Sequence, residues 1–184
     1  MSPDPDRERE WLRRISGGDR SAFEELYHAY HRRVFGYLFR MVGSGDRADE
    51  LTSDVLLEVW KSAGRFKGES RPSTWIFGIA RHKALSALRR SEPATVEVEE
   101  VHDLRDSGEA QDAMMITAGM QQAVRSALAT LSAPHREVME LTFYDGFSYP
   151  EIAEILKCPV NTVKTRMFHA RKQLRERLGA LETS

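Results

Sequence analysis

Apolar residues recur at intervals of three and four along most of the chain, which is the period of an amphipathic α-helix. The first such stripe predicts a helix that begins after Asp19 or Ser21, either of which can cap it. The helix is expected to end at the glycines Gly43 and Gly45. Its apolar positions are Phe23, Leu26, Tyr27, Tyr30, Val34, Leu38 and Met41.

Two further stripes predict two further helices. The first of these has Asp46 as its expected cap and ends near Gly64, and its apolar positions are Leu51, Val55, Leu56, Val59 and Trp60. A loop rich in Gly, Ser and Pro, residues 65–72, separates it from the next helix, which Ser73 or Thr74 can cap. The apolar positions of that helix are Trp75, Ile76, Ile79, Ala80, Ala84, Ala87 and Leu88.

Residues 91–117 interrupt this pattern, because they have no sustained period and carry eight acids against one base. Such a segment is typical of a flexible linker. The alternative is a short strand formed by Val96, Val98 and Val101. The chain is therefore expected to be all-α, with two small helical domains, residues 1–90 and 118–184, joined by this linker.

The second domain is expected to be a four-helix unit that contains a helix-turn-helix. The apolar stripe of its first helix consists of Met120, Val124, Leu128 and Leu131. The next helix is expected to start with the segment Ser132–Pro134 and to end at Asp145 and Gly146. The tetrapeptide Ser148–Glu151 is a capping box, in which the Glu151 carboxylate reaches back to the first residue of the motif. After a brief turn at Lys157 and Cys158, a basic helix follows with its apolar positions at Val160, Val163, Met167, Ala170, Leu174 and Leu178. A short capped helix, a turn and a longer basic helix is the order of a DNA-binding helix-turn-helix.

The net charge of −1 conceals segments of opposite sign. Residues 1–90 carry 17 Lys and Arg against 13 Asp and Glu, and residues 118–184 carry nine against seven. No acid lies between Glu69 and Glu92, and residues 157–177 hold seven bases and one acid. Two basic stretches joined by an acidic connector indicate two contacts with one long polyanion, although two solvated helix faces explain the charge equally well.

Composition narrows the class of protein. The chain has 184 residues, 41% of them hydrophobic and 30% charged, which is ordinary for a globular protein. Its start has no apolar segment of the secretory type, no stretch is long enough to span a bilayer, and its one cysteine, Cys158, excludes a disulfide framework. A cytoplasmic protein is expected.

Few residues point to catalysis. The sequence has no phosphate-binding glycine loop, no nucleophile elbow and no Cys/His cluster with metal spacing, so neither a catalytic residue nor a cofactor is predicted. His28 and His31 lack an evident third metal ligand. The acidic residues Asp49, Glu50, Asp54 and Glu58 favour a protein-binding face over a metal site, because nearby bases compete with a metal ion and no histidine joins them.

Four segments of the first domain resemble the second conserved region of bacterial sigma factors of the extracytoplasmic-function (ECF) class: Asp19–Tyr27, Ala48–Trp60, Ser73–Arg81 and Leu88–Arg90. Residues Leu131–Leu178 resemble the fourth region, above all in Tyr149–Leu156 and Pro159–Leu174. Both matches stand in the family's order, and together they cover most of the chain.

The resemblance implies a protein that binds core RNA polymerase and directs transcription from promoters with −10 and −35 elements, commonly under the control of an anti-sigma factor. It implies −35 contacts, some of them also suggested by the exposed positions of the last helix, at Asn161, Thr162, Lys164, Thr165, Arg166, His169, Arg171 and Lys172. It implies −10 contacts, where aromatic and basic side chains alternate, at Phe66, Lys67, Arg71, Trp75, Arg81, His82, Lys83, Arg89 and Arg90. The residues it implies for docking on core polymerase are Asp49, Asp54, Leu57 and Glu58.

The sequence departs from the family pattern at three places. His82 stands where the family has asparagine, Asn161 where it has glycine, and Lys157–Cys158 where it has a small apolar turn. His82 concerns the −10 contacts, whereas the departures at Asn161 and at Lys157–Cys158 lead us to expect an unusual −35 sequence. The free protein is expected to be monomeric and to bind promoters poorly, because only polymerase fixes the spacing of two weak DNA contacts.

Two other functions compete with this interpretation. A conventional regulator would bind duplex DNA tightly through its helix-turn-helix without polymerase, as a dimer. A nuclease using the acidic face would need an added divalent ion.

Overall fold

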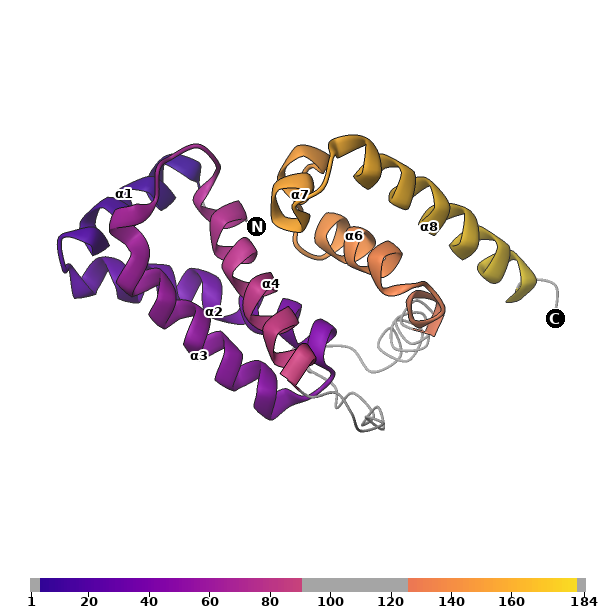
Figure 1. Ribbon diagram of the computed structural model, residues 1–184, viewed down its shortest axis with the longest axis horizontal. Coiled ribbons are helices and arrows are strands. Elements are labelled where there is room, and N and C mark those ends of the chain that lie inside the picture. Colours follow the sequence, from indigo (N-terminus) through magenta and orange to yellow (C-terminus); the bar gives the residue numbers. More distant parts are fainter. Residues whose placement is uncertain (1–3, 91–125, 182–184) are drawn as a thin grey trace, which may run out of the picture.

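The computed structural model describes residues 4–90 and 126–181, and within those ranges every regular element is a helix. Figure 1 shows two groups of helices lying side by side: α1–α4, drawn from indigo to pink, and α6–α8, drawn from orange to yellow. The predicted all-α class is confirmed for this part of the chain. The proposed linker 91–117, its strand alternative, and the positions Met120 and Val124 lie outside the described residues.

The first group consists of α1 (Pro5–Ser16), α2 (Arg20–Val42), α3 (Gly45–Ser62) and α4 (Pro72–Arg90), with one 3-10 turn, Ala63–Arg65, after α3. Asp19 caps α2 as predicted, because its carboxylate accepts a hydrogen bond from the Ala22 amide at 3.2 Å. Gly43 ends α2 in the left-handed conformation (φ 70°), which glycine adopts without a Cβ clash. The largest fully buried side chains of this group are Leu12, Leu26, Tyr30, Tyr37, Leu38, Leu56, Ile76 and Phe77.

Three expectations for this group were wrong. The group has four helices and not three, because Trp11, Leu12 and Ile15 of α1 are buried in the same core; their stripe is only one and a half turns long. The side chain of Ser44, not Asp46, caps α3 by accepting from the Arg47 amide at 3.5 Å. Ser73 and Thr74 do not precede α4 but are buried in its first turn, which begins at Pro72, a residue suited to that position.

The second group consists of α6 (Ala133–Phe143), α7 (Tyr149–Leu156) and α8 (Val160–Leu181), preceded by a helical segment at residues 126–129. The predicted capping box is present: the Glu151 carboxylate accepts from the Ser148 amide at 2.8 Å and from its hydroxyl at 2.6 Å. Lys157 ends α7 in the left-handed conformation (φ 53°). Val163, Met167 and Ala170 bury one face of α8 against α6 and α7, and this leaves the opposite face exposed.

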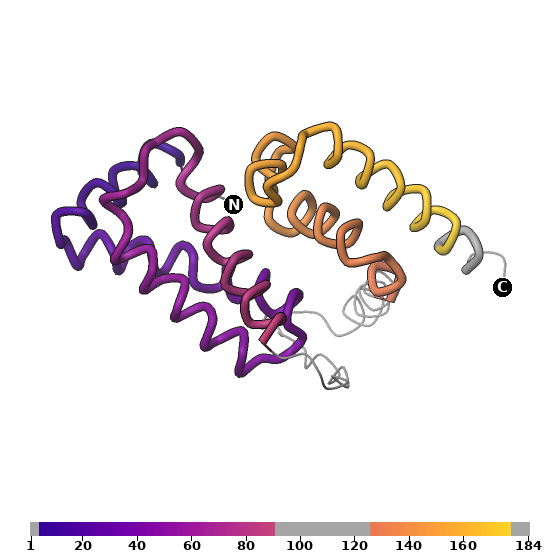
Figure 2. Tube along the Cα trace, in the orientation of Figure 1, coloured from indigo at the N-terminus to yellow at the C-terminus, as the bar shows by residue number. Residues whose placement is uncertain are grey.

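The two groups are in contact through α4 and α7, which run next to each other where the pink and orange tubes meet in Figure 2. This contact brings residues about 80 positions apart in sequence together, and it determines how accessible each candidate site is.

Candidate nucleic-acid interface

The exposed face of α8 carries most of the predicted −35 residues. Six of the eight are exposed, and the other two, Thr162 and Arg166, are half-buried; the exposed six are Asn161, Lys164, Thr165, His169, Arg171 and Lys172. The Thr165 hydroxyl donates to the Asn161 carbonyl at 2.9 Å, so it is already engaged within the helix. The His169 ring stacks on His135 of α6, with centroids 6.0 Å apart.

A groove of about 510 Å³ runs along this face. The four cations that line it are Lys164, Arg171, Lys172 and Arg175, together with Tyr149, Met167, Phe168 and one acid, Glu176. No ion pair joins those four cations to an acid among the residues that the structure describes. A cationic groove on the outer face of a helix-turn-helix suits a DNA backbone.

Phe168 is the residue of this face that the sequence analysis missed. It is 65% exposed and sits four residues after Lys164 and four before Lys172, on the same side of α8. An exposed phenylalanine among cations can contact the methyl group of thymine in the major groove. The signal was available in the sequence, since buried Val163 and Met167 fix the register that turns position 168 outward.

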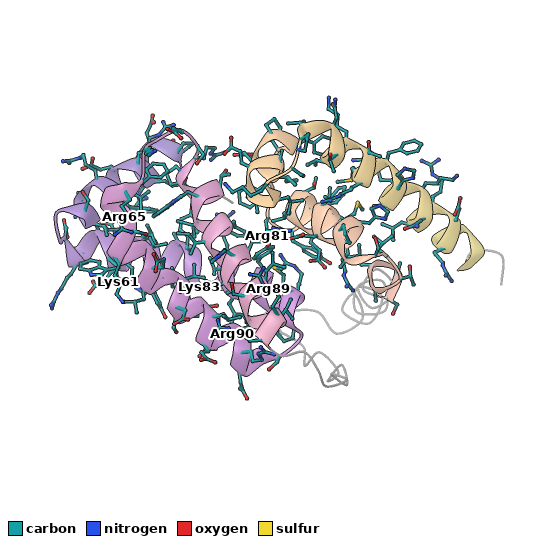
Figure 3. All side chains as sticks on the ribbon, viewed as in Figure 1. Lys61, Arg65, Arg81, Lys83, Arg89 and Arg90 are labelled. Atoms are coloured by element: carbon teal, nitrogen blue, oxygen red, sulfur yellow. The ribbon has the colours of Figure 1, made fainter. Side chains whose placement is uncertain are left out.

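The predicted −10 residues lie in the loop before α4 and along α4 itself. Phe66 and Trp75 pack against each other with ring centroids 5.4 Å apart, and both are half-buried, so they belong partly to the core. Lys67, His82, Arg89 and Arg90 are exposed. Figure 3 shows four of the α4 cations: Arg81, Lys83, Arg89 and Arg90.

A groove of about 640 Å³ lies between α3, α4 and α7, and some of the predicted −10 residues line it. Trp75, His82, Lys83 and Arg90 line it from α4, and Glu154 and Lys157 line it from the second group. The structure therefore brings four predicted −10 residues together, but it also places residues of α7 at the same groove.

Arg71 and Arg81 are engaged in ion pairs. Arg71 donates to Glu151 of α7 at 3.3 Å, and Arg81 donates to Glu137 of α6 at 2.9 Å. The Arg81 side chain is only 21% exposed. Both arginines are thus paired with carboxylates of the second group.

The predicted docking face on α3 is acidic around one exposed apolar side chain. Asp49, Asp54 and Leu57 are exposed and Glu58 is half-buried; Leu57 is 48% exposed. Lys83 of α4 reaches Asp54 at 3.9 Å. An exposed leucine with acidic neighbours suits a partner that offers an apolar pocket with a basic rim.

Neither a membrane helix nor a metal cluster is found in the described ranges. No helix there is long and apolar enough to cross a bilayer. No group of three His, Cys, Asp or Glu side chains in residues 4–90 and 126–181 is placed to hold a metal ion.

Two family models match the chain. Sigma-70 region 2 matches residues 26–93, which include most of the first helix group, and Sigma-70, region 4 matches residues 121–174, which include α6, α7 and most of α8. A region 2 unit followed by a region 4 helix-turn-helix defines an RNA polymerase sigma factor.

Relatives that are similar over almost the whole length of the chain show which class of sigma factors it belongs to. The RNA polymerase sigma-H factor of Pseudomonas aeruginosa is 27% identical over 96% of both chains. The ECF RNA polymerase sigma-E factor of Escherichia coli is 29% identical over 92% of this chain and 93% of its own, and the ECF RNA polymerase sigma factor SigK of Mycobacterium bovis is 29% identical over 89% of each. The chain belongs to the ECF family of RNA polymerase sigma factors.

Two solved structures share the fold. CnrH, determined in complex with the cytosolic domain of CnrY, is 25% identical with a TM-score of 0.67 over 95% of this chain and 98% of its own. The sigma factor RpoE of Bartonella quintana, determined with the anti-sigma factor NepR, is 26% identical with a TM-score of 0.68 over 85% of this chain and 96% of its own. As a sigma factor, the protein binds core RNA polymerase and promoter DNA, and it directs promoter-specific initiation of transcription.

Proposed function

We propose that α8 reads the −35 element in the major groove, with Lys164, Arg166 and Phe168 at base edges. The remaining predicted residues, Asn161, Thr162, Thr165, His169, Arg171 and Lys172, hold the backbone and the groove edges. The observation that carries this proposal is the exposed cationic groove of α8, whose other face is buried by Val163, Met167 and Ala170. A helix fixed on one face and cationic on the other presents its first turns to DNA.

The loop before α4 and α4 itself are the proposed −10 site. Cations that follow a strand backbone, with aromatic faces for an unstacked base, are what a melted strand requires. Phe66, Lys67, Arg71, Trp75, Arg81, His82, Lys83, Arg89 and Arg90 supply them. Trp75 is the proposed aromatic face, since it lines the groove that His82 and Lys83 share.

The acidic face of α3 is the proposed contact with core polymerase. Leu57 provides the apolar anchor, and Asp49, Asp54 and Glu58 provide charge complementarity to a basic partner. This division assigns residues 1–90 to polymerase docking and −10 melting, residues 91–117 to an acidic linker in the RNA exit path, and residues 118–184 to −35 recognition. The protein itself catalyses no reaction in this proposal and acts in the cytoplasm as a monomer before it joins the polymerase.

An anti-sigma factor is the proposed regulator. One similar solved structure, the sigma factor RpoE of Bartonella quintana, was determined with the anti-sigma factor NepR, and another, CnrH, was determined with the cytosolic domain of CnrY. A partner of this kind would cover the exposed surfaces of both helix groups.

One set of holoenzyme assays tests these roles separately. Leu57→Arg should abolish co-elution of the protein with sigma-free core polymerase, whereas Lys164→Ala should co-elute normally and lose −35-dependent transcription. Glu24→Arg, a charge change at an exposed position of α2, is the control and should leave both readouts unchanged. Normal co-elution of Leu57→Arg would refute the docking face, and normal transcription by Lys164→Ala would refute the recognition face.

A further inference from the structure

Glu8 of α1 is a buried carboxyl group that none of the proposed roles uses. Its exposed fraction is 0%, whereas every other charged residue of α1 is exposed or half-buried. The hydroxyl of Tyr30 in α2, which is buried as well, donates a hydrogen bond to the Glu8 Oε1 atom. Because burial of an ionisable group costs free energy unless partners surround it, the other groups around Glu8 show what it holds.

The first turn of α4 supplies further partners of Glu8. The Trp75 amide donates to the Arg71 carbonyl at 3.1 Å, so Arg71 stands at the cap position and residues 72–74 form the first turn. Amides of a first turn have no partner within their own helix, and an arginine side chain has no acceptor to offer them. The Glu8 carboxyl lies near this turn and brings the negative charge that the positive end of a helix favours.

The groups that favour a charged Glu8 come partly from this same place. Burial raises the pKa of the Glu8 carboxyl above its ordinary value, and four groups oppose that rise: the Tyr30 hydroxyl, the Arg71 guanidinium, the Ser73 backbone and the Arg33 guanidinium. Tyr30 and Arg33 belong to α2, whereas Arg71 and Ser73 stand at the start of α4. The carboxyl therefore joins α1 and α2 to the point where the preceding loop ends.

Helix α1 also contacts the other end of that loop. It packs against the 3-10 turn Ala63–Arg65, where the loop begins, as well as against α4, and Figure 1 shows it beside the connection from α3 to α4. A Cβ atom placed on Gly64 would lie 3.7 Å from the Ser16 Cβ, so the last turn of α1 lies directly against this turn. Residues 66–71 are thus bounded at both ends by contacts with one helix.

We infer that Glu8 is a positioning residue of the −10 site: it holds the first turn of α4 against α1 and α2, and so fixes the loop that carries Phe66, Lys67 and Arg71. The effect on −10 binding rests on the proposed role of these three residues, whereas the hold on the loop does not. A loop that is already fixed loses less conformational entropy when it binds an unstacked base, so it binds more tightly. The Sigma-70 region 2 match begins at residue 26, beyond α1, and assigns Glu8 no role.

Hydrogen–deuterium exchange of the full chain, without polymerase or DNA, tests the hold on the loop. Glu8→Leu removes both carboxyl oxygens at similar volume and should speed exchange of the amides of residues 66–75 by about tenfold, while the amides of α3 exchange as in wild type. Leu38→Ala is the control for lost stability, because it shortens a buried side chain of α2 outside this cluster. It should lower the melting temperature and leave exchange in the loop unchanged. A folded Glu8→Leu variant with wild-type exchange at residues 66–75 would overturn the inference.

Glu8→Gln is the milder variant for the case that Glu8→Leu does not fold. It keeps the side-chain volume and an acceptor oxygen for the Tyr30 hydroxyl, and it loses only the charge that attracts Arg71. Exchange at residues 66–75 should therefore rise by less than in Glu8→Leu but stay above that of wild type. Exchange identical to wild type in this variant would equally overturn the hold on the loop.

A single-stranded oligonucleotide tests the consequence for the −10 site. It carries the −10 sequence common to the mapped start sites, and its affinity for holoenzyme is measured by fluorescence anisotropy. Glu8→Leu should bind it about tenfold more weakly, at unchanged co-elution with core polymerase and unchanged −35-dependent binding of duplex DNA. Leu38→Ala, at a temperature where it is folded, should bind it like wild type.

The two measurements separate the inference from the proposed function. Faster exchange in the loop with wild-type affinity for the oligonucleotide would overturn the positioning role of Glu8 in −10 binding. A wild-type holoenzyme that does not bind the oligonucleotide would instead refute the proposed −10 site, while the exchange result would stand.

Discussion

The two candidate DNA surfaces of this protein are built from the same residue types, but they differ in how many of their cations are paired with acids. On α8, Lys164, Lys172 and Arg175 point into an open groove. On α4 and the loop before it, Arg81 and Arg71 are paired with carboxylates from the other helix group. The difference teaches that a basic helix is not by itself an available binding site, because its accessibility is determined by what the rest of the chain places against it.

The largest expected effect lies on the open surface. Lys164→Ala and Arg166→Ala should each weaken promoter binding by the holoenzyme by about 1–3 kcal/mol where a base contact is lost. Lys164 is exposed, so its replacement should leave the thermal midpoint of unfolding unchanged. Holoenzyme affinity for a promoter fragment measures the loss. On a fragment with a scrambled −35 element, variants and wild type should become equal; a difference that persists there would place the contact elsewhere.

The next effect tests Phe168. Replacing a −35 thymine by uracil removes one methyl group, and loss of its contact with the ring should cost wild type about 0.8 kcal/mol. Phe168→Ala should show no difference between the two bases, since it lacks the ring. A promoter series with uracil at each −35 thymine in turn makes the measurement. If the variant and wild type respond equally to every uracil, Phe168 does not touch a methyl group.

A smaller effect lies at the boundary of the two surfaces. Lys157 is a non-glycine residue with positive φ and ends α7 beside the α4 groove. Lys157→Gly should stabilise the protein by about 0.5 kcal/mol, because relief of the left-handed conformation, worth roughly 1–2 kcal/mol, exceeds the added freedom of the unfolded chain. Lys157→Ala is the control and should give no gain. Equal melting temperatures for the two variants would contradict this explanation.

The smallest effect is a pH dependence of the contact between the two helix groups. Burial raises the pKa of the Glu140 and Asp145 carboxyls above their ordinary values, although Arg40 beside them opposes the rise. Because helix groups in contact then bind protons more readily than separated groups with hydrated carboxyls, the contact is favoured as pH falls through the raised pKa values and is weakened as pH rises above them. Arg33 and Arg136 also face this pair.

Scattering measures that dependence. The radius of gyration should be slightly smaller at a pH below the raised pKa values than at a pH above them. The double variant Glu140→Gln/Asp145→Asn has no carboxyl to titrate at this place and should lose the difference. A wild-type chain that expands on acidification would show that protonation of these carboxyls weakens the contact and would contradict this prediction.

Much of the fold and of the α8 face could be predicted, because both depend on local patterns. The Asp19 cap, the Gly43 stop and the Ser148–Glu151 capping box each lie within a few residues of the helix end that they define. The exposed register of α8 follows from Val163 and Met167 alone. The short apolar stripe of α1 gave too weak a signal, so its burial was missed.

The state of the α4 surface could not be predicted, because it depends on contacts between distant segments. Arg81 and Glu137 are 56 positions apart, and Tyr37 and Glu137 are 100 apart. Helical periodicity says which side of α4 is polar, but it does not say that a second helix group covers it. Ion pairs across a tertiary contact leave no pattern in a single sequence.

Run-off transcription tests the central claim most directly. Sigma-free core polymerase is supplied with promoter-bearing genomic fragments, with and without this protein. Discrete transcripts only in its presence, with start sites that share one −35 and one −10 sequence, are the expected result. Absence of transcripts, together with tight specific binding of the free protein to duplex DNA and no co-elution with core polymerase, would contradict the account.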